Sequence, residues 1–225
     1  MKEGFTGTGA KDMRKDLEIR YLQNWKHLRN EEYVLHAVAY HGAPVLKGYK
    51  PAVIVTFAND RRRLLRDAWR EHRTLIPWTA DFRYEELYQT AAQTAVLLYH
   101  PGLLREVLVN RQVALFLETL GYRKELTVEG ALADLKEHYR TGCPHEIGLF
   151  LGIPLPDVLG FIHHGGKRAL ADGYWKVYHD PGRKQALFAL FYEAKLEFIR
   201  LMLAGNPPGD YLSGKASRLA DAAAG

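Results

Sequence analysis

Apolar residues recur every three to four positions in several segments of the chain, the spacing that places side chains on one face of an α-helix. This pattern predicts helices over residues 13–30, 101–120 and 127–139, with a break near Asn110 inside the second. A broader apolar stripe follows Asp180 and predicts a long C-terminal helix with much of its surface buried.

Short runs rich in β-branched and aromatic residues predict strands. The clearest run is Ala-Val-Ile-Val-Thr-Phe at 52–57, and Ala-Val-Leu-Leu-Tyr at 95–99 is a second. The segment 173–178, Gly-Tyr-Trp-Lys-Val-Tyr, alternates between two faces. We therefore expect Trp175 and Val177 in the core, with the tyrosines and the lysine of this segment on the opposite face.

Four further segments give less decisive patterns. Residues 33–40 fit either a strand or a buried helix, and periodicity alone leaves both open. A loop with two glycines and two prolines is expected over 41–51. Residues 75–78 are expected as a short edge strand, because their proline cannot donate a hydrogen bond to a neighbouring strand. Residues 81–93, which are polar with interspersed aromatics, are expected to be helical.

The order of these elements predicts an α+β fold, an irregular mixed α/β sandwich with a short central sheet. We expect one globular domain over residues 13–204. The segments 1–12 and 205–225 are expected to be flexible tails, because they are rich in glycine and polar or small residues.

Composition narrows the class of protein. Of 225 residues, 47% are hydrophobic and 25% charged, which is ordinary for a soluble globular domain. No apolar run approaches the roughly 20 residues that cross a bilayer, and the N-terminus does not resemble a signal peptide, so a cytoplasmic location is expected. The single cysteine excludes an internal disulfide framework and a cysteine-rich zinc site. A net charge of +5 permits contact with anions without demonstrating it.

The centre of the chain combines the pattern of a helix start with that of a helix pair. Cys143 stands at an N-cap position, Pro144 at the first helical position and Glu146 three residues after the cap, which is the layout of a capping box. The residues that follow fit a helix-turn-helix template, with Gly148 where two helices approach and Gly152 at the turn. We therefore expect a helix-turn-helix-like pair here.

The second helix of this pair lacks the side chains that read DNA. Bases are read by Arg, Lys, Asn, Gln and hydroxyl side chains. The positions expected to be exposed on this helix are instead Leu155, Pro156, Asp157, Leu159 and Gly160. Asp157 would also repel phosphate, so the sequence disfavours DNA recognition by this helix.

Candidate chemistry gathers at both ends of this central region. His145 begins a helix beside a carboxylate and could act as a general acid or base, although the same residues could simply start the helix. An aromatic-lysine-aromatic face at 174–178 could stack a planar ligand or could face solvent. We expect a pocket for a small anionic or aromatic ligand. Its candidate residues are His41, Lys50, His145, Glu146, Tyr174, Trp175, Lys176 and Tyr178.

No metal site or particular cofactor is predicted. The histidines of the central region lack the His-x-x-x-His spacing and the acidic pair that zinc or iron sites use. Nor does the sequence decide whether the protein is an enzyme.

An expected helix at 61–73 carries the most basic surface of the chain. Its arginines are Arg61, Arg62, Arg63, Arg66, Arg70 and Arg73. A solvated helix face, with Asp67 and Glu71 as partial counterions, is one interpretation, and a nucleic-acid contact is the alternative. A module that binds a protein partner is a third hypothesis.

Four segments carry a resemblance to a known family. The long central motif is Pro-His-Glu-Ile-Gly-Leu-Phe-Leu-Gly-Ile-Pro-Leu-Pro-Asp-Val-Leu-Gly-Phe-Ile at 144–162, followed by the aromatic segment 173–178. The loop 43–52 and the short Leu-Gly-Tyr at 120–122 resemble weaker family segments. Together they resemble the bacterial family catalogued as domain of unknown function 3793, which is found largely in anaerobic Firmicutes.

The resemblance implies candidate residues but no reaction, since the family has no established activity. Residues that match its motif are Lys50, His145, Glu146, Gly148, Trp175 and Lys176. The family resembled has an aromatic residue at the position of Cys143, which implies that thiol chemistry is not a shared function. It also implies a link to anaerobic iron and flavodoxin metabolism, through neighbouring genes.

Overall fold

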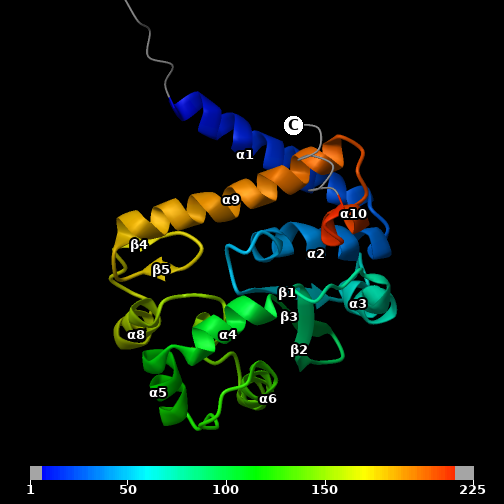
Figure 1. Cartoon of the computed structure of the whole chain (residues 1–225). Helices are drawn as coiled ribbons and strands as arrows, with labels where there is room; N and C mark the ends of the chain where they lie inside the picture. Colours follow the sequence, from blue (N-terminus) through cyan, green and yellow to red (C-terminus); the bar gives the residue numbers. More distant parts are fainter. Residues whose placement is uncertain (1–6, 216–225) are drawn as a thin grey trace, which may run out of the picture.

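A three-stranded antiparallel sheet lies at the centre of the computed structural model, which describes residues 7–215 (Figure 1). Its strand order is β1-β3-β2. The strands are β1 (Ala52–Ala58), β2 (Arg83–Gln89) and β3 (Gln93–Tyr99). The register places Val55 opposite Val96 and Tyr84 opposite Leu98, so β3 receives hydrogen bonds on both edges.

The central strand β3 is buried on both of its faces. Val96 and Leu98 point into one hydrophobic core, whereas Leu97 and Tyr99 point into a second core on the opposite face. Burial on both sides explains why the sequence of this strand is a continuous apolar run and not an alternating one. The predicted strands at 52–57 and 95–99 are confirmed.

Helices packed in two tiers cover one face of the sheet. Helix α2 (Asn30–Leu46) lies against β1 and β3, and the long helix α9 (Pro181–Leu203) crosses α2 on its outer side (Figure 1). Helix α1 (Gly7–Asn24) lies beside α9, and α3 (Leu65–His72) packs against α2 and β1. The closing helix predicted after Asp180 is confirmed.

Shorter helices cover the opposite face of the sheet (Figure 1). They are α4 (Pro101–Val109), α5 (Arg111–Thr119), α6 (Val128–Tyr139), α7 (Ile147–Phe150) and α8 (Leu155–His164). The remaining elements are the 3₁₀ turns Trp25–His27 and Arg73–Leu75, a hairpin of β4 (Ala171–Asp172) and β5 (Lys176–Val177), and α10 (Pro208–Leu212).

Side-chain caps explain where several of these helices begin. The Asn110 side chain accepts hydrogen bonds from the backbone N–H groups of Gln112 and Val113, so the predicted break near this residue is confirmed as the start of α5. Thr127 accepts a hydrogen bond from the N–H of Gly130 and caps α6, which confirms the helix start expected at this residue.

The ambiguous segment 33–40 is helical, as part of α2. Its apolar residues are buried around most of the helix, because α2 lies between the sheet on one side and α9 and α10 on the other. The loop expected over 41–51 is shorter than predicted, since α2 continues to Leu46 with Pro44 inside its last turn. Packing on both sides outweighs the hydrogen bond that proline cannot donate.

Three expectations around β2 are wrong. Residues 83–89 form an edge strand and not a helix, and residues 75–78 follow a 3₁₀ turn without entering the sheet. The basic segment 61–73 is helical only from Leu65, because Asn59 pairs with Leu64 in an isolated β-bridge and forms a turn between them.

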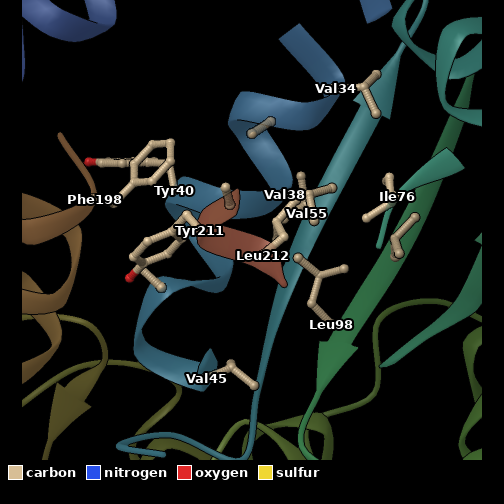
Figure 2. Packing of buried hydrophobic residues seen from close by; sticks show 14 of the residues in the cluster. Val34, Val38, Tyr40, Val45, Val55, Ile76, Leu98, Phe198, Tyr211 and Leu212 are labelled. Carbon is tan, nitrogen blue, oxygen red and sulfur yellow. The ribbon is translucent and has the colours of Figure 1, made fainter. Parts of the chain in front are cut away.

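The expected tails also differ from the structure. Residues 7–12 begin α1, while residues 1–6 lie outside the described part. At the other end, Tyr211 and Leu212 of α10 insert between α2 and Phe198 of α9 (Figure 2). Tyr211 and Leu212, which were expected in a flexible tail, are therefore part of the core, while residues 216–225 of that expected tail lie outside the described part.

None of the helices described over residues 7–215 carries an apolar stretch long enough to cross a membrane.

The core position of α10 predicts a stability effect. Leu212 is 1% exposed, so Leu212→Ala should lower the free energy of unfolding by about 2–5 kcal/mol, measured by urea denaturation. Leu203, 58% exposed at the end of α9, is the matched control, and Leu203→Ala should change it by no more than about 0.5 kcal/mol. Equal effects of the two substitutions would contradict the packing of α10 described above.

Candidate ligand-binding site

A cavity of about 410 Å³ lies between the segment preceding α7, the helices α7 and α8, and strand β5. Its lining residues are Cys143, Pro144, His145, Ile147, Gly148, Leu151, Ile153, Asp157, Val158, Phe161, Trp175 and Lys176. Three of the eight predicted ligand contacts, His145, Trp175 and Lys176, are brought together here. We call this cavity the central pocket.

Close packing of α7 against α8 forms the floor of the central pocket. A Cβ atom on Gly148 would lie 3.0 Å from Cγ2 of Val158 and 3.4 Å from Cδ1 of Ile153. A larger residue would require Val158 to shift by a few tenths of an ångström, so glycine favours the close approach of the two helices that the sequence predicted at this position. Gly152, with φ of +76°, makes the turn between them, a conformation that favours glycine.

A buried carboxylate fixes the hairpin wall of the pocket. One oxygen of Asp157 accepts a hydrogen bond from Nε1 of Trp175 at 3.0 Å. Its other oxygen accepts from the backbone N–H groups of Tyr178 and His179 at 2.8 and 2.9 Å. The expectation that Asp157 is exposed on α8 is wrong, because these three donors satisfy it in the interior.

Polar groups lie along the rim of the pocket. The ring of His145 meets that of Phe161 edge to face, with 5.6 Å between centroids. The Cys143 thiol is exposed and lies 3.4 Å from the Tyr139 hydroxyl. Lys176 forms an exposed ion pair with Asp172. An apolar cavity with a thiol, an imidazole and an ammonium group near its opening suits a mostly apolar molecule with a few polar atoms.

Glu146 has a structural role that differs from the predicted capping box. The helix α7 starts at Ile147 without a side-chain cap, and the buried Glu146 carboxylate lies 2.6 Å from Nδ1 of His138. It also accepts a hydrogen bond from the Tyr122 hydroxyl at 3.4 Å. Burial, and then the charge of Glu146, raise the pKa of Tyr122 above its usual range. Glu146 therefore joins α6 to the start of α7 and does not line the pocket.

The predicted face of Tyr174, Lys176 and Tyr178 is not formed. Tyr174 lies in the turn between β4 and β5, while Tyr178 stacks on His164 with 5.6 Å between ring centroids. The Tyr178 hydroxyl is buried without a hydrogen-bond partner among the described residues. The opposite face is confirmed, since Trp175 and Val177 are both buried in a core cluster with Phe191.

Besides Glu146, Tyr174 and Tyr178, two more of the predicted ligand contacts do not line the central pocket. His41 is in the last turns of α2, and Lys50 follows that helix. Lys50 is buried with its ammonium 5.6 Å from the centre of the Phe191 ring. Tyr174 contacts the same ring, at 5.2 Å between centroids. The expected single site therefore divides into the central pocket and a second cluster around Phe191.

The six arginines of the basic segment do not form one helix face. Arg63 donates to the backbone oxygen of Trp25 and lies over the ring of Tyr33. Arg66 pairs with Asp67, and Arg73 with Glu86. Those left exposed are Arg61, Arg62 and Arg70.

Sequence reasoning missed His138 and Lys195, which lie on helices whose spacing indicated only an amphipathic surface. His138 is identified by its contact with Glu146, and Lys195 by its contacts with the rings of Tyr40 and Tyr174, all of which form only in the folded chain.

The buried position of Glu146 predicts a difference between adjacent substitutions. Glu146→Ala should lower the free energy of unfolding by about 1–3 kcal/mol, because it removes the hydrogen-bond partner of Tyr122 and His138. His145→Ala, at an exposed neighbour, should change it by no more than about 0.5 kcal/mol. Chemical denaturation of both variants measures this, and a small loss for Glu146→Ala would show that the buried contacts contribute little.

Comparison with known families confirms the resemblance of the central motif. The family model described as Protein of unknown function (DUF3793) matches residues 38–210, well over half of the chain. The matched range contains the central pocket and Lys50. No curated protein and no solved structure matched the chain. The chain belongs to the DUF3793 family of proteins of unknown function.

Proposed function

We propose that the protein binds a small, largely apolar molecule with a flat ring in the central pocket. The observation that supports this most is the composition of the cavity, whose walls are formed mainly by aliphatic and aromatic side chains. A volume of about 410 Å³ falls in the range of small-molecule sites, roughly 300–1,000 Å³. Trp175 and Phe161 supply aromatic surface, against which a ring gains contact area and favourable ring geometry.

Rigid support for the pocket strengthens the proposal. The hydrogen bonds from Trp175 and the hairpin backbone to Asp157 hold one wall, and the close approach of α7 and α8 at Gly148 holds the floor. Walls that are already ordered lose little conformational entropy when a ligand binds. His145 and Cys143 at the rim then provide a donor or acceptor that would orient polar atoms of the ligand.

Binding in the central pocket predicts opposite outcomes for two neighbouring residues of α8. Phe161, 38% exposed, lines the pocket, whereas Ile162, 42% exposed, does not. We expect native mass spectrometry or a thermal-shift panel of flavin, haem and nucleotides to identify a binder. Phe161→Ala should weaken its affinity about tenfold or more, because the ring loses its contact surface, and Ile162→Ala should leave it within about twofold.

Two results would contradict this function. One is the absence of any co-purified molecule together with an unchanged melting temperature across the panel. The other is an equal loss of affinity in both variants, which would place the ligand outside the pocket.

A nucleic-acid contact is the second candidate function, and it is favoured by the exposure of Arg61 and Arg62 in the turn that precedes α3. Binding through these side chains should weaken steeply as salt rises, because counterions are released from phosphates. The double variant Arg61→Gln/Arg62→Gln should bind DNA or RNA several-fold more weakly at 50 mM salt. Arg111→Gln, an equally exposed arginine on α5, should not.

Gel-shift titrations across a salt series measure this. A flat salt response, or an equal effect of the Arg111→Gln control, would exclude nucleic-acid binding through Arg61 and Arg62.

A further inference from the structure

Two lysines and a histidine lie together between α2, α9 and the turn of the β4–β5 hairpin. The ammonium of Lys195 is 4.8 Å from the ring centre of Tyr40 and 5.2 Å from that of Tyr174. The ring of Tyr174 contacts the ring of Phe191, and the ammonium of Lys50 lies over that second ring. His41 contacts Tyr40, with 5.0 Å between ring centroids. We call Lys50, Lys195 and His41, with the rings between them, the basic cluster.

The basic cluster lacks matching negative charge. Among the side chains described over residues 13–215, no carboxylate forms an ion pair with Lys50 or Lys195. The carboxylate of Glu18 on α1 only partly opposes the lowering of the Lys195 pKa by burial, and it accepts a hydrogen bond from Tyr40. Lys50 is only 8% exposed, and buried ammonium groups are normally paired because their desolvation is unfavourable.

The aromatic contacts satisfy these lysines only in part. A ring face attracts an ammonium group electrostatically, but each ammonium carries three N–H donors that a ring face does not fully satisfy. A compact oxyanion has several acceptor oxygens and a full negative charge. Such a group placed between Lys50 and Lys195 would accept hydrogen bonds from both and remove the repulsion between them.

We propose that the basic cluster binds a small oxyanion, the phosphate or carboxylate group of a metabolite, between Lys50 and Lys195. The basic cluster reaches solvent at Tyr174, which is 40% exposed, and at half-buried Lys195 and His41. This site is separate from the central pocket, since none of its charged residues lines that cavity. A negative result for ligand binding in the central pocket therefore does not contradict oxyanion binding in the basic cluster, and the reverse also holds.

The protonation of the lysines and the histidine in the basic cluster determines how oxyanion affinity depends on pH. Burial, and then the charge of Lys195, lower the pKa of Lys50 to about 8, and the same two causes lower that of His41 to about 4. Burial also lowers the pKa of Lys195. At neutral pH Lys50 is thus still mostly an ammonium, while His41 is neutral and can donate or accept one hydrogen bond.

Other titratable groups face the basic cluster, and they do not change the direction of its pH dependence. Burial raises the pKa of Tyr40, Tyr174 and Tyr192, so these phenols stay neutral through pH 8. Glu18 is an opposing negative charge that keeps the affinity moderate. An oxyanion needs the charged form of Lys50, so its affinity should be highest below pH 8. It should fall up to tenfold per pH unit above that value.

Thermal unfolding with added anions tests the proposal. Phosphate, acetate and chloride are compared at constant ionic strength and pH 7, using the full chain. Phosphate or acetate, and not chloride, should raise the Tm, on the order of 4 °C at ten times the Kd, and further in proportion to the logarithm of the anion concentration. Phosphate acting alone assigns a phosphate site, and acetate acting alone assigns a carboxylate site. The rise should shrink when the series is repeated at pH 9.

Single lysine substitutions test whether the rise in Tm comes from binding at the basic cluster. Lys50→Met and Lys195→Met keep the length of the side chain and remove its charge, and each should abolish the rise. Lys167→Met, in the turn after α8, removes the same charge elsewhere and should retain it. Because Lys50→Met removes an unpaired buried charge, it is expected to fold, and Lys195→Met provides an independent second readout. No rise with either oxyanion, or an equal rise in all variants, would overturn the proposal.

Discussion

Burial of the central strand β3 on both of its faces is the constraint on which the rest of this structure depends. Each face of a three-stranded sheet must be covered, and the short strands supply too little apolar surface to be stable alone. One face is covered by α2 and then by α9, α1 and α10, and the other by the helices from α4 to α8. The central pocket and the basic cluster both include residues of the β4–β5 hairpin, which packs against α8 and α9.

Much of the architecture is readable from local sequence, and the exceptions share one cause. Strand β3, the long helix α9, the break near Asn110 and the helix start at Thr127 carry strong local signals, and all were predicted. Strand β2 was not, because its charged residues are stabilised by distant partners. Glu86 accepts a hydrogen bond from Nε1 of Trp69, and Glu85 pairs with Lys136. Such tertiary contacts override the local polar pattern, which resembled a helix.

The residues of the candidate sites differ in the same way, since some are marked by local sequence and others only by tertiary contacts. His145, Trp175 and Lys176 could be grouped from the sequence, because a helix-start pattern marks the first and an alternating strand pattern marks the other two. Lys195 is no farther from the hairpin in the chain, but it lies on a helix surface whose spacing does not indicate its neighbours. Glu146 illustrates the opposite case. Its spacing fitted a local motif well, yet a histidine on the preceding helix determines its role.

The place of α10 in the first core has a consequence for how the protein is made. That core unites α1 and α2 with α9 and with Tyr211 and Leu212, so it cannot close until residue 212 has left the ribosome. The second core needs only residues between 52 and 158, and could form while the chain is still being synthesised. Until residue 212 has emerged, the side of α2 that packs against α9 and α10 would stay exposed to water.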